Sequence, residues 1–166
     1  MLTPKTQTIV YIPGILNFAL YWRIPHRLKK AFTKYFPGAV FATEDCFYFP
    51  LGKTKMLRFA EEILKKHDVA GQEVILLGYS MGGVIATVIA PRFKHAKVRV
   101  ITLMAPHTYL WGLFSKMLGS SLSSDGGIDI VSFQGQHDLF VVPCGAKHPH
   151  ARKHVIIPQC GHLLKM

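Results

Sequence analysis

A chain of 166 residues is the size of a single domain, and we expect one domain over residues 1–166. Its residues are 49% hydrophobic and only 17% charged, which excludes a disordered or low-complexity chain. The 20 Lys and Arg residues outnumber the nine Asp and Glu residues and give a net charge of +11, which favours an anionic partner without identifying one.

Short strand-like runs alternate with longer helical runs along the chain. In chain order, the sequence predicts a strand over residues 8–12, a helix over 25–36, a strand over 39–43, a helix over 55–67, a strand over 73–77, a helix over 81–90, strands over 98–104, 128–133 and 154–157, and a short terminal helix over 161–166. In the second helix, Met56, Ala60 and Ile63 share one face. Mostly apolar strands separated by helices are typical of a parallel sheet, so we expect an α/β protein with about six mostly parallel strands and helices on both faces.

The N-terminal sequence and the cysteines indicate where the protein works. Residues 1–8 lack the pattern of a signal peptide, and Pro13 and Gly14 break an apolar run over 8–20 that is too short to span a bilayer. Three cysteines at wide spacing, with no CxxC pair, are typical of a reducing compartment. We therefore expect a cytoplasmic protein, although a mature secreted chain without its leader would have the same sequence.

The clearest chemical motif is Gly78-Tyr79-Ser80-Met81-Gly82, which fits the pattern G-x-S-x-G. The strand predicted over 73–77 runs directly into it, and the helix predicted over 81–90 leaves it directly. This setting is that of a nucleophile elbow, in which the serine occupies a strained turn between small residues. The Ser80 hydroxyl would then stand at a helix N-terminus, where backbone N–H groups favour developing negative charge. An ordinary glycine-rich turn is the alternative.

A serine hydroxyl needs a base and an orienting acid, which in this architecture follow in the order Ser, Asp or Glu, His. Asp138 follows the strand predicted over 128–133 and lies 58 residues after Ser80. His162 follows the strand predicted over 154–157 and lies 24 residues after Asp138. Because the carboxyl ends of parallel strands meet at one edge of a sheet, we predict that these three residues form the catalytic site.

Other acids and histidines compete for the two supporting roles. Asp129 falls inside its strand and Asp125 precedes it, so both are placed worse than Asp138. His107 comes before the acid in the chain, and His137 is too close in sequence to Asp138 to face it easily. The acid and the base named above are therefore preferred.

An oxyanion hole needs two backbone N–H donors aimed at the tetrahedral intermediate. Met81, directly after the serine, is expected to supply one of them. The other is expected from the loop Pro13-Gly14-Ile15, with the N–H of Ile15 as donor and Gly14 allowing the backbone to come close. An ordinary Pro-Gly turn is the alternative for this loop.

Together these motifs resemble the α/β-hydrolase superfamily, and the short chain resembles its minimal bacterial lipases and esterases. The resemblance covers the strand and Pro-Gly loop at 8–17, the elbow at 78–83, the acid region at 135–143 and Gly161-His162. It implies a minimal α/β-hydrolase fold that lacks the first two strands of the full fold and has no cap domain. Many relatives have His-Gly where this chain has Pro13-Gly14.

The resemblance implies a serine hydrolase that cleaves carboxylic esters of short to medium acyl length through a Ser-His-Asp triad and an acyl-enzyme. A thioesterase or acyltransferase with the same triad is the first alternative. A basic nucleic-acid- or membrane-binding module with a vestigial triad is a remoter one. No cofactor and no metal are expected, because the tract with His148, His150 and His154 contains no Cys or carboxylate to complete a site.

Residues near the predicted catalytic edge are candidates for binding an ester substrate, including a lipid. They are Gly14, Phe18, Trp22, Tyr79, Leu110, Trp111 and Phe140. About half of such apolar residues would instead belong to the core. The apolar run over 110–118 could form a small lid or settle on a lipid surface. Because the basic residues are spread over several elements, we expect a solvated basic surface with some attraction to an anionic membrane surface, and no specific nucleic acid.

Overall fold

Six parallel strands form one sheet. The computed structural model describes residues 7–14, 23–44, 53–108, 110, 113, 116, 128–141 and 145–162. The strands are β1 (Gln7–Ile12), β2 (Val40–Thr43), β3 (Glu73–Tyr79), β4 (Lys97–Leu103), β5 (Asp129–Gly135) and β6 (Lys153–Ile157). Their order in the sheet is β2-β1-β3-β4-β5-β6, and every neighbouring pair is parallel. The expected parallel sheet is confirmed, and β6 is an edge strand that pairs with β5.

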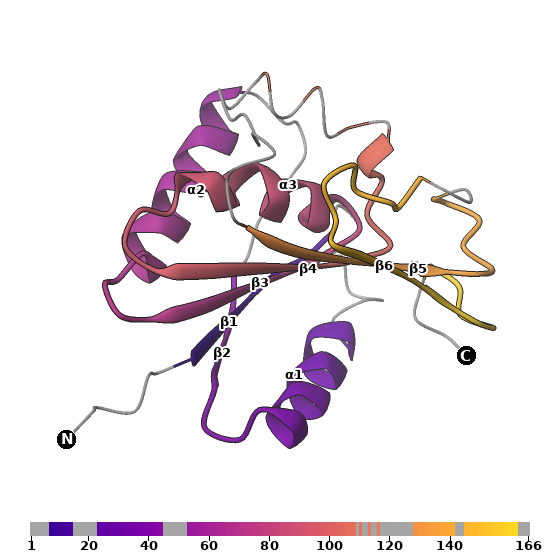
Figure 1. Cartoon of the computed structure of the whole chain (residues 1–166), viewed down its shortest axis with the longest axis horizontal. Coiled ribbons are helices and arrows are strands. Elements are labelled where there is room, and N and C mark those ends of the chain that lie inside the picture. The colour runs from indigo at the N-terminus through magenta and orange to yellow at the C-terminus, as the bar shows by residue number, and fades with distance from the viewer. Residues whose placement is uncertain are drawn as a thin grey trace.

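Helices cover both faces of this sheet, as expected. The α-helices whose bounds the described residues establish are α1 (Arg23–Tyr35), α2 (Lys53–His67) and α3 (Met81–Ile89). Figure 1 shows α2 and α3 above the sheet and α1 below it. None of the helices in the described residues is both long enough and apolar enough to cross a membrane.

Alternation along the strands divides the core into two layers. In β1, Val10 packs in the layer that contains α2 and α3, whereas Tyr11 packs in the layer that contains α1. From α2, the predicted face of Met56, Ala60 and Ile63 enters the first layer. A fully buried aliphatic side chain of this size contributes roughly 1.5–3 kcal/mol. Both faces of the central strands are therefore held by apolar packing, which fixes the edge where the strands end.

The two helix boundaries that involve proline differ from the prediction. α1 begins at Arg23, two residues before the predicted start, so Pro25 lies within the first turn, where its missing N–H has no intrahelical partner. α3 ends at Ile89, and Ala90–Arg92 form a short 3-10 helix, η1. Pro91 accounts for the change, because a proline cannot continue the hydrogen-bonding pattern of an α-helix.

Strand and C-terminal boundaries also differ. β4 ends at Leu103, because Met104 has φ 50°, a left-handed conformation that cannot continue a strand. β5 runs on to Gly135, two residues beyond its predicted end. At the predicted terminal helix, Gly161 and His162 are not helical, and the rest of that segment lies outside the described residues.

Candidate active site

Ser80 stands in the turn between β3 and α3. Its backbone has φ 52° and ψ −126°, a conformation that non-glycine residues rarely adopt and that costs roughly 1–3 kcal/mol. Two backbone hydrogen bonds hold the turn: the N–H of Ser80 donates to Leu103 O at 2.8 Å, and the N–H of Gly83 donates to Ser80 O at 3.0 Å. The central sheet and the start of α3 therefore fix the strained turn and the position of the Ser80 hydroxyl.

Two glycines let the backbone come close to Ser80. A Cβ at Gly82 would overlap the carbonyl oxygens of Ile12 and Pro13, so only glycine lets α3 begin this close to the end of β1. A Cβ at Gly14 would lie 2.9 Å from Ser80 Cβ and 3.4 Å from its Oγ. The loop after β1 therefore passes directly beside the serine, where the second oxyanion donor is expected.

The structure brings together the three residues that the sequence predicts as a triad. Nε2 of His162 lies 3.1 Å from Ser80 Oγ, and Nδ1 of His162 lies 2.8 Å from Asp138 Oδ2. Asp138 is 4% exposed, and its Oδ1 accepts the backbone N–H groups of Phe140 and Val141, each at 2.9 Å. These two bonds hold the carboxylate in one orientation and leave Oδ2 for the imidazole.

The loops that carry the acid and the histidine are bonded to each other. The N–H of His137 donates to Cys160 O at 2.9 Å, and the N–H of Gln136 donates to Ile157 O at 3.0 Å. Burial and the nearby Asp138 carboxylate raise the pKa of the Cys160 thiol, which keeps this thiol protonated beneath the site. The carboxylate and the imidazole therefore lie on one joined unit.

Two aromatic side chains flank the His162 imidazole. The Tyr79 hydroxyl donates to the backbone carbonyl of His162, and the two ring centroids lie 5.4 Å apart. The Phe140 ring lies 5.2 Å from the imidazole and is 72% exposed. Both were predicted to bind substrate. Tyr79 is buried, and its hydroxyl supports the His162 loop, whereas Phe140 is exposed and open to a substrate.

The structure describes two of the other predicted site residues, Met81 and Leu110. Met81 is the first residue of α3, so its N–H lies at the helix N-terminus beside Ser80. Leu110 is half-buried against the core layer of α2 and α3, whereas Leu113 is exposed, and both are helical. Leu139, 90% exposed and directly after the acid, is an apolar neighbour that sequence reasoning missed. Outside the described residues lie Ile15, Phe18, Trp22, Trp111 and the competing acid Asp125.

The residues that compete for the roles of base and acid, His107, His137 and Asp129, make their contacts away from Ser80. His107 is buried, its Nε2 lies 3.2 Å from Thr102 Oγ1, and burial together with neighbouring histidines lowers its pKa well below the usual range. His137 is exposed, and its backbone rather than its ring contributes to the loop pairing. Asp129 begins β5 at the opposite edge and pairs with Arg152 at 2.6 Å. None of these contacts involves the serine.

The histidines of the tract considered as a metal site make contacts within the protein. The rings of His148 and the buried His107 meet edge-on with centroids 4.7 Å apart. The N–H of His150 donates to His148 Nδ1 at 3.1 Å, and His154 Nδ1 lies 2.8 Å from Ser132 Oγ. Over the part of the chain that the structure describes, no three His, Cys, Asp or Glu side chains come together as a metal site.

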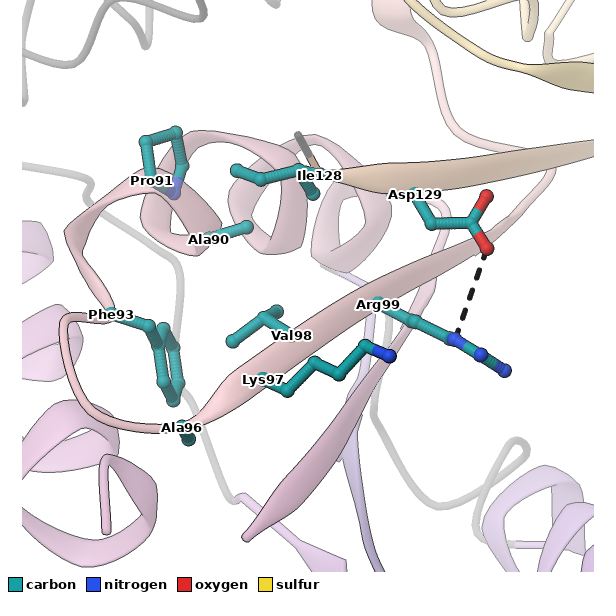
Figure 2. A pocket seen from close by; sticks show the side chains of 9 residues that line it. All are labelled: Ala90, Pro91, Phe93, Ala96, Lys97, Val98, Arg99, Ile128 and Asp129. Atoms are coloured by element: carbon teal, nitrogen blue, oxygen red, sulfur yellow. Dashed lines mark ion pairs between the residues drawn. The ribbon is translucent and has the colours of Figure 1, made fainter. Parts of the chain in front are cut away.

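A cavity of about 440 Å³ lies at the edge of the sheet opposite Ser80. Figure 2 shows that its walls come from η1, the loop after it and the first residues of β4 and β5. Arg99 and Asp129 face each other there at 3.8 Å. Because the triad stands at the carboxyl ends of the strands, this cavity is separate from the candidate active site.

Comparison with protein families gives a partial match. A model of the PGAP1-like alpha/beta domain matches residues 53–120. This span contains α2, β3, α3 and β4, and therefore the Ser80 turn. No curated protein sequence matches the chain.

Solved structures match almost the whole chain. Est1E from Butyrivibrio proteoclasticus has a TM-score of 0.70 over 99% of this chain and 83% of its own, at 11% identity. An alpha-beta serine hydrolase homologue from Coxiella burnetii has a TM-score of 0.60 over 95% and 77%, at 16% identity. MGS-MChE2, an alpha/beta hydrolase from the metagenome of lagoon sediments in Morocco, has a TM-score of 0.56 over 96% and 83%, at 15% identity. The likeness at these identities lies in the fold.

Proposed function

This chain has the α/β-hydrolase fold, and we propose that within it Ser80, His162 and Asp138 form the triad of a carboxylic ester hydrolase. The observation that carries the proposal is the hydrogen-bonded series from Ser80 through His162 to Asp138, with separations of 3.1 and 2.8 Å. A nucleophile and a base within hydrogen-bond reach, with the base oriented by an acid, meet the geometric requirement for covalent acyl transfer.

In the acylation step, Ser80 Oγ attacks the carbonyl carbon of the ester while Nε2 of His162 takes the hydroxyl proton. Asp138 accepts the hydrogen bond from Nδ1–H and stabilises the imidazolium that forms. His162 then gives this proton to the oxygen of the leaving alcohol as the C–O bond breaks. The products of this step are the free alcohol and an acyl ester on Ser80.

Hydrolysis of the acyl ester repeats the sequence with water. His162 takes a proton from a water molecule, which attacks the acyl carbon, and Ser80 leaves with the proton returned to its Oγ. In both steps negative charge develops on the carbonyl oxygen, where the N–H of Met81 and the predicted donor Ile15 would stabilise it. Removal of one such donor typically lowers kcat by about 10²–10³.

The apolar residues beside the triad support an apolar substrate group. Leu139 and Phe140 are exposed directly after the acid, and the Phe140 ring lies against the imidazole of His162. An acyl or alkyl group placed there would lose contact with water against these side chains. We therefore expect uncharged esters with short to medium acyl chains as substrates.

The proposal is tested with p-nitrophenyl esters of increasing acyl length and a fluorophosphonate probe. The wild-type protein should hydrolyse the esters and take up the probe on Ser80. Ser80→Ala should abolish labelling, and Ser80→Ala or His162→Ala should lower turnover by about 10³-fold or more. As a matched control, His137→Ala removes an exposed imidazole next to the acid and should keep most of the activity. Folded wild-type protein that neither labels nor turns over would contradict the proposal.

The same triad could serve a thioesterase or an acyltransferase, so the substrate panel separates the three reactions. Oxygen esters and thioesters of the same acyl group should be compared by kcat/KM, with and without an added alcohol as acceptor. A preference for oxygen esters with water as acceptor is expected. A large preference for thioesters, or an acylated alcohol as main product, would replace the ester hydrolase by the corresponding alternative.

A further inference from the structure

The outer face of α1 carries positive charge and no negative charge. The exposed side chains there include His26, Arg27, Lys29, Lys30 and Lys34. Residues 23–43 contain no Asp or Glu. Among the described residues, no carboxylate forms an ion pair with a cation of α1. The charge of this face is therefore uncompensated.

Several basic residues on other elements have acidic partners. Lys66 of α2 lies 2.8 Å from Glu44, and Arg152 lies 2.6 Å from Asp129. α2 also exposes two glutamates between its basic residues. The net charge of +11 is therefore distributed unevenly, because α1 carries basic side chains without an acidic one, whereas α2 carries both kinds.

The basic side chains of α1 border a shallow hollow of about 560 Å³. Its described lining consists of His26, Lys29, Lys30, Thr33 and Lys34. These positions are three or four residues apart or adjacent, so successive turns of one helix present ammonium groups to the same space. An anionic phosphate group placed in the hollow would be within reach of several of these cations.

An exposed aromatic side chain lies at the end of this basic face. Tyr35 is 72% exposed, and the Nζ atom of Lys34 lies 5.5 Å from its ring centroid. Tyrosine suits the interface between headgroups and acyl chains, because its ring is apolar and its hydroxyl is polar.

The inner face of α1 fixes the orientation of the basic face. Ile24, Leu28 and Phe32 pack into the core layer that also contains Tyr79 and Cys160. Because these apolar side chains are occupied within the protein, they would not insert into a partner, and α1 would contact it through its charged face. The shared layer also connects α1 directly to the residues under the candidate active site.

We propose that the outer face of α1 docks the protein on an anionic lipid bilayer. Clusters of four to eight Lys and Arg residues on an amphipathic helix are typical of surfaces that bind acidic lipids. The attraction is electrostatic, so it weakens steeply with salt. The exposed Tyr35 favours a bilayer over a phosphate backbone, because its ring can lie at the level of the lipid headgroups while its hydroxyl stays in water.

Sedimentation with lipid vesicles tests the proposal on the full chain. Wild-type protein should bind vesicles of phosphatidylcholine with 30% phosphatidylserine, an amount of acidic lipid on the order of that in cytoplasmic leaflets, and not pure phosphatidylcholine. The variant Lys29→Glu, Lys30→Glu, Lys34→Glu should bind the acidic vesicles about 100-fold more weakly.

The matched control reverses three exposed basic residues of α2, on the opposite face of the sheet (Figure 1). Each reversal lowers the net charge by two, so both triple variants fall from +11 to +5. The control is Lys55→Glu, Arg58→Glu, Lys65→Glu and should keep binding within a few-fold of wild type. Ser80→Ala should also bind like wild type, which separates docking from the proposed hydrolysis.

Three results would overturn the docking surface. The first is equal loss of binding in both triple variants, which would show that net charge alone matters. The second is failure of wild-type protein to bind acidic vesicles at low salt. The third is tighter binding to a duplex or single-stranded oligonucleotide than to vesicles at the same salt, with the same dependence on α1. Circular dichroism of each variant confirms that it is folded.

Discussion

At the scale of single residues, the candidate base is positioned by more than its acid. Asp138 orients the imidazole of His162 through Nδ1, whereas Tyr79 holds the backbone of the same residue through its carbonyl. Tyr79 is adjacent in sequence to Ser80, so this bond joins the serine turn to the histidine loop. The distance between Ser80 Oγ and His162 Nε2 therefore depends on a hydroxyl that takes no part in proton transfer.

Replacing Tyr79 by Phe removes this bond and keeps the ring packed. We expect kcat for a p-nitrophenyl ester to fall roughly tenfold with little change in KM, because one buried hydrogen bond contributes about 1–1.5 kcal/mol and here acts on the base alone. Steady-state kinetics check the split. Tyr35→Phe is the control, since it removes a tyrosine hydroxyl at an exposed position outside the candidate site. An unchanged kcat in Tyr79→Phe would contradict this role.

All three residues of the candidate triad could be predicted from the sequence, whereas the contacts that support them could not. The G-x-S-x-G motif and the order Ser, Asp, His point to Ser80, Asp138 and His162 because each follows a strand. The Tyr79 bond joins residues 83 positions apart, and no local pattern reports such a contact. In the same way, pairing of Lys66 with Glu44, 22 positions apart, appears only in the folded chain, so the sequence could not separate compensated from uncompensated charge.

At the scale of elements, the loop after β5 packs its histidines against the end of β4. His148 is buried against His107, and the N–H of His150 donates to the Nδ1 atom of His148, which requires a neutral ring. Burial, with a contribution from His150, lowers the pKa of His148 to about 4. Burial also lowers the pKa of His107 and of His154. This packing exists only while the imidazoles are uncharged.

The protein should therefore lose stability in mild acid. An unfolded histidine has a pKa of about 6.5, so below this pH the unfolded chain takes up protons that the folded protein excludes. For His148 the loss begins near pH 6.5 and continues to about pH 4, the folded pKa. Each such histidine lowers the free energy of unfolding by up to about 1.4 kcal/mol per pH unit in this window.

Urea unfolding at pH 7, 6 and 5 measures this slope. His148→Asn keeps an acceptor for the N–H of His150 and should give a slope smaller by about one proton than wild type. Equal slopes for wild type and His148→Asn would show that His148 is not the group that titrates.

Elements were easier to predict than their ends. Continuous apolar runs indicate strands buried on both faces, and the six strands of the sheet follow those runs. The end of β4 depends on the positive φ of Met104. The residues around it favour a strand, so the sequence does not predict this conformation. The start of α1 at Arg23 likewise follows from the packing of its first turn, because Ile24 enters the core layer beneath the sheet.

At the scale of the whole molecule, the residues of the candidate site follow strands that differ in how many neighbouring strands they pair with. Ser80 follows β3, which lies inside the sheet between β1 and β4. His162 follows β6, an edge strand of five residues that pairs only with β5 among the described strands. Ile156 in β6 is 60% exposed, and Val155 and Ile157 are half-buried. The strand before the histidine is therefore held by fewer contacts than the strand before the serine.

Activity should consequently be lost before the fold. In a urea titration, we expect ester hydrolysis to have a lower midpoint than far-UV circular dichroism, because opening of β6 displaces His162 while β1, β3 and β4 remain paired. Amide hydrogen exchange should also be faster in β6 than in β3. Coincident midpoints, with equal exchange in the two strands, would show that the sheet opens as one unit.

Because β6 is an edge strand, the part of the candidate site that follows it should open before the central strands of the sheet separate. The proposed nucleophile Ser80 follows a central strand, and the proposed base His162 follows the edge strand. Heat or denaturant too mild to melt the protein would leave a folded but inert population with its serine intact. Such inactivation should reverse as soon as the strand pairs again, without any need to rebuild the core.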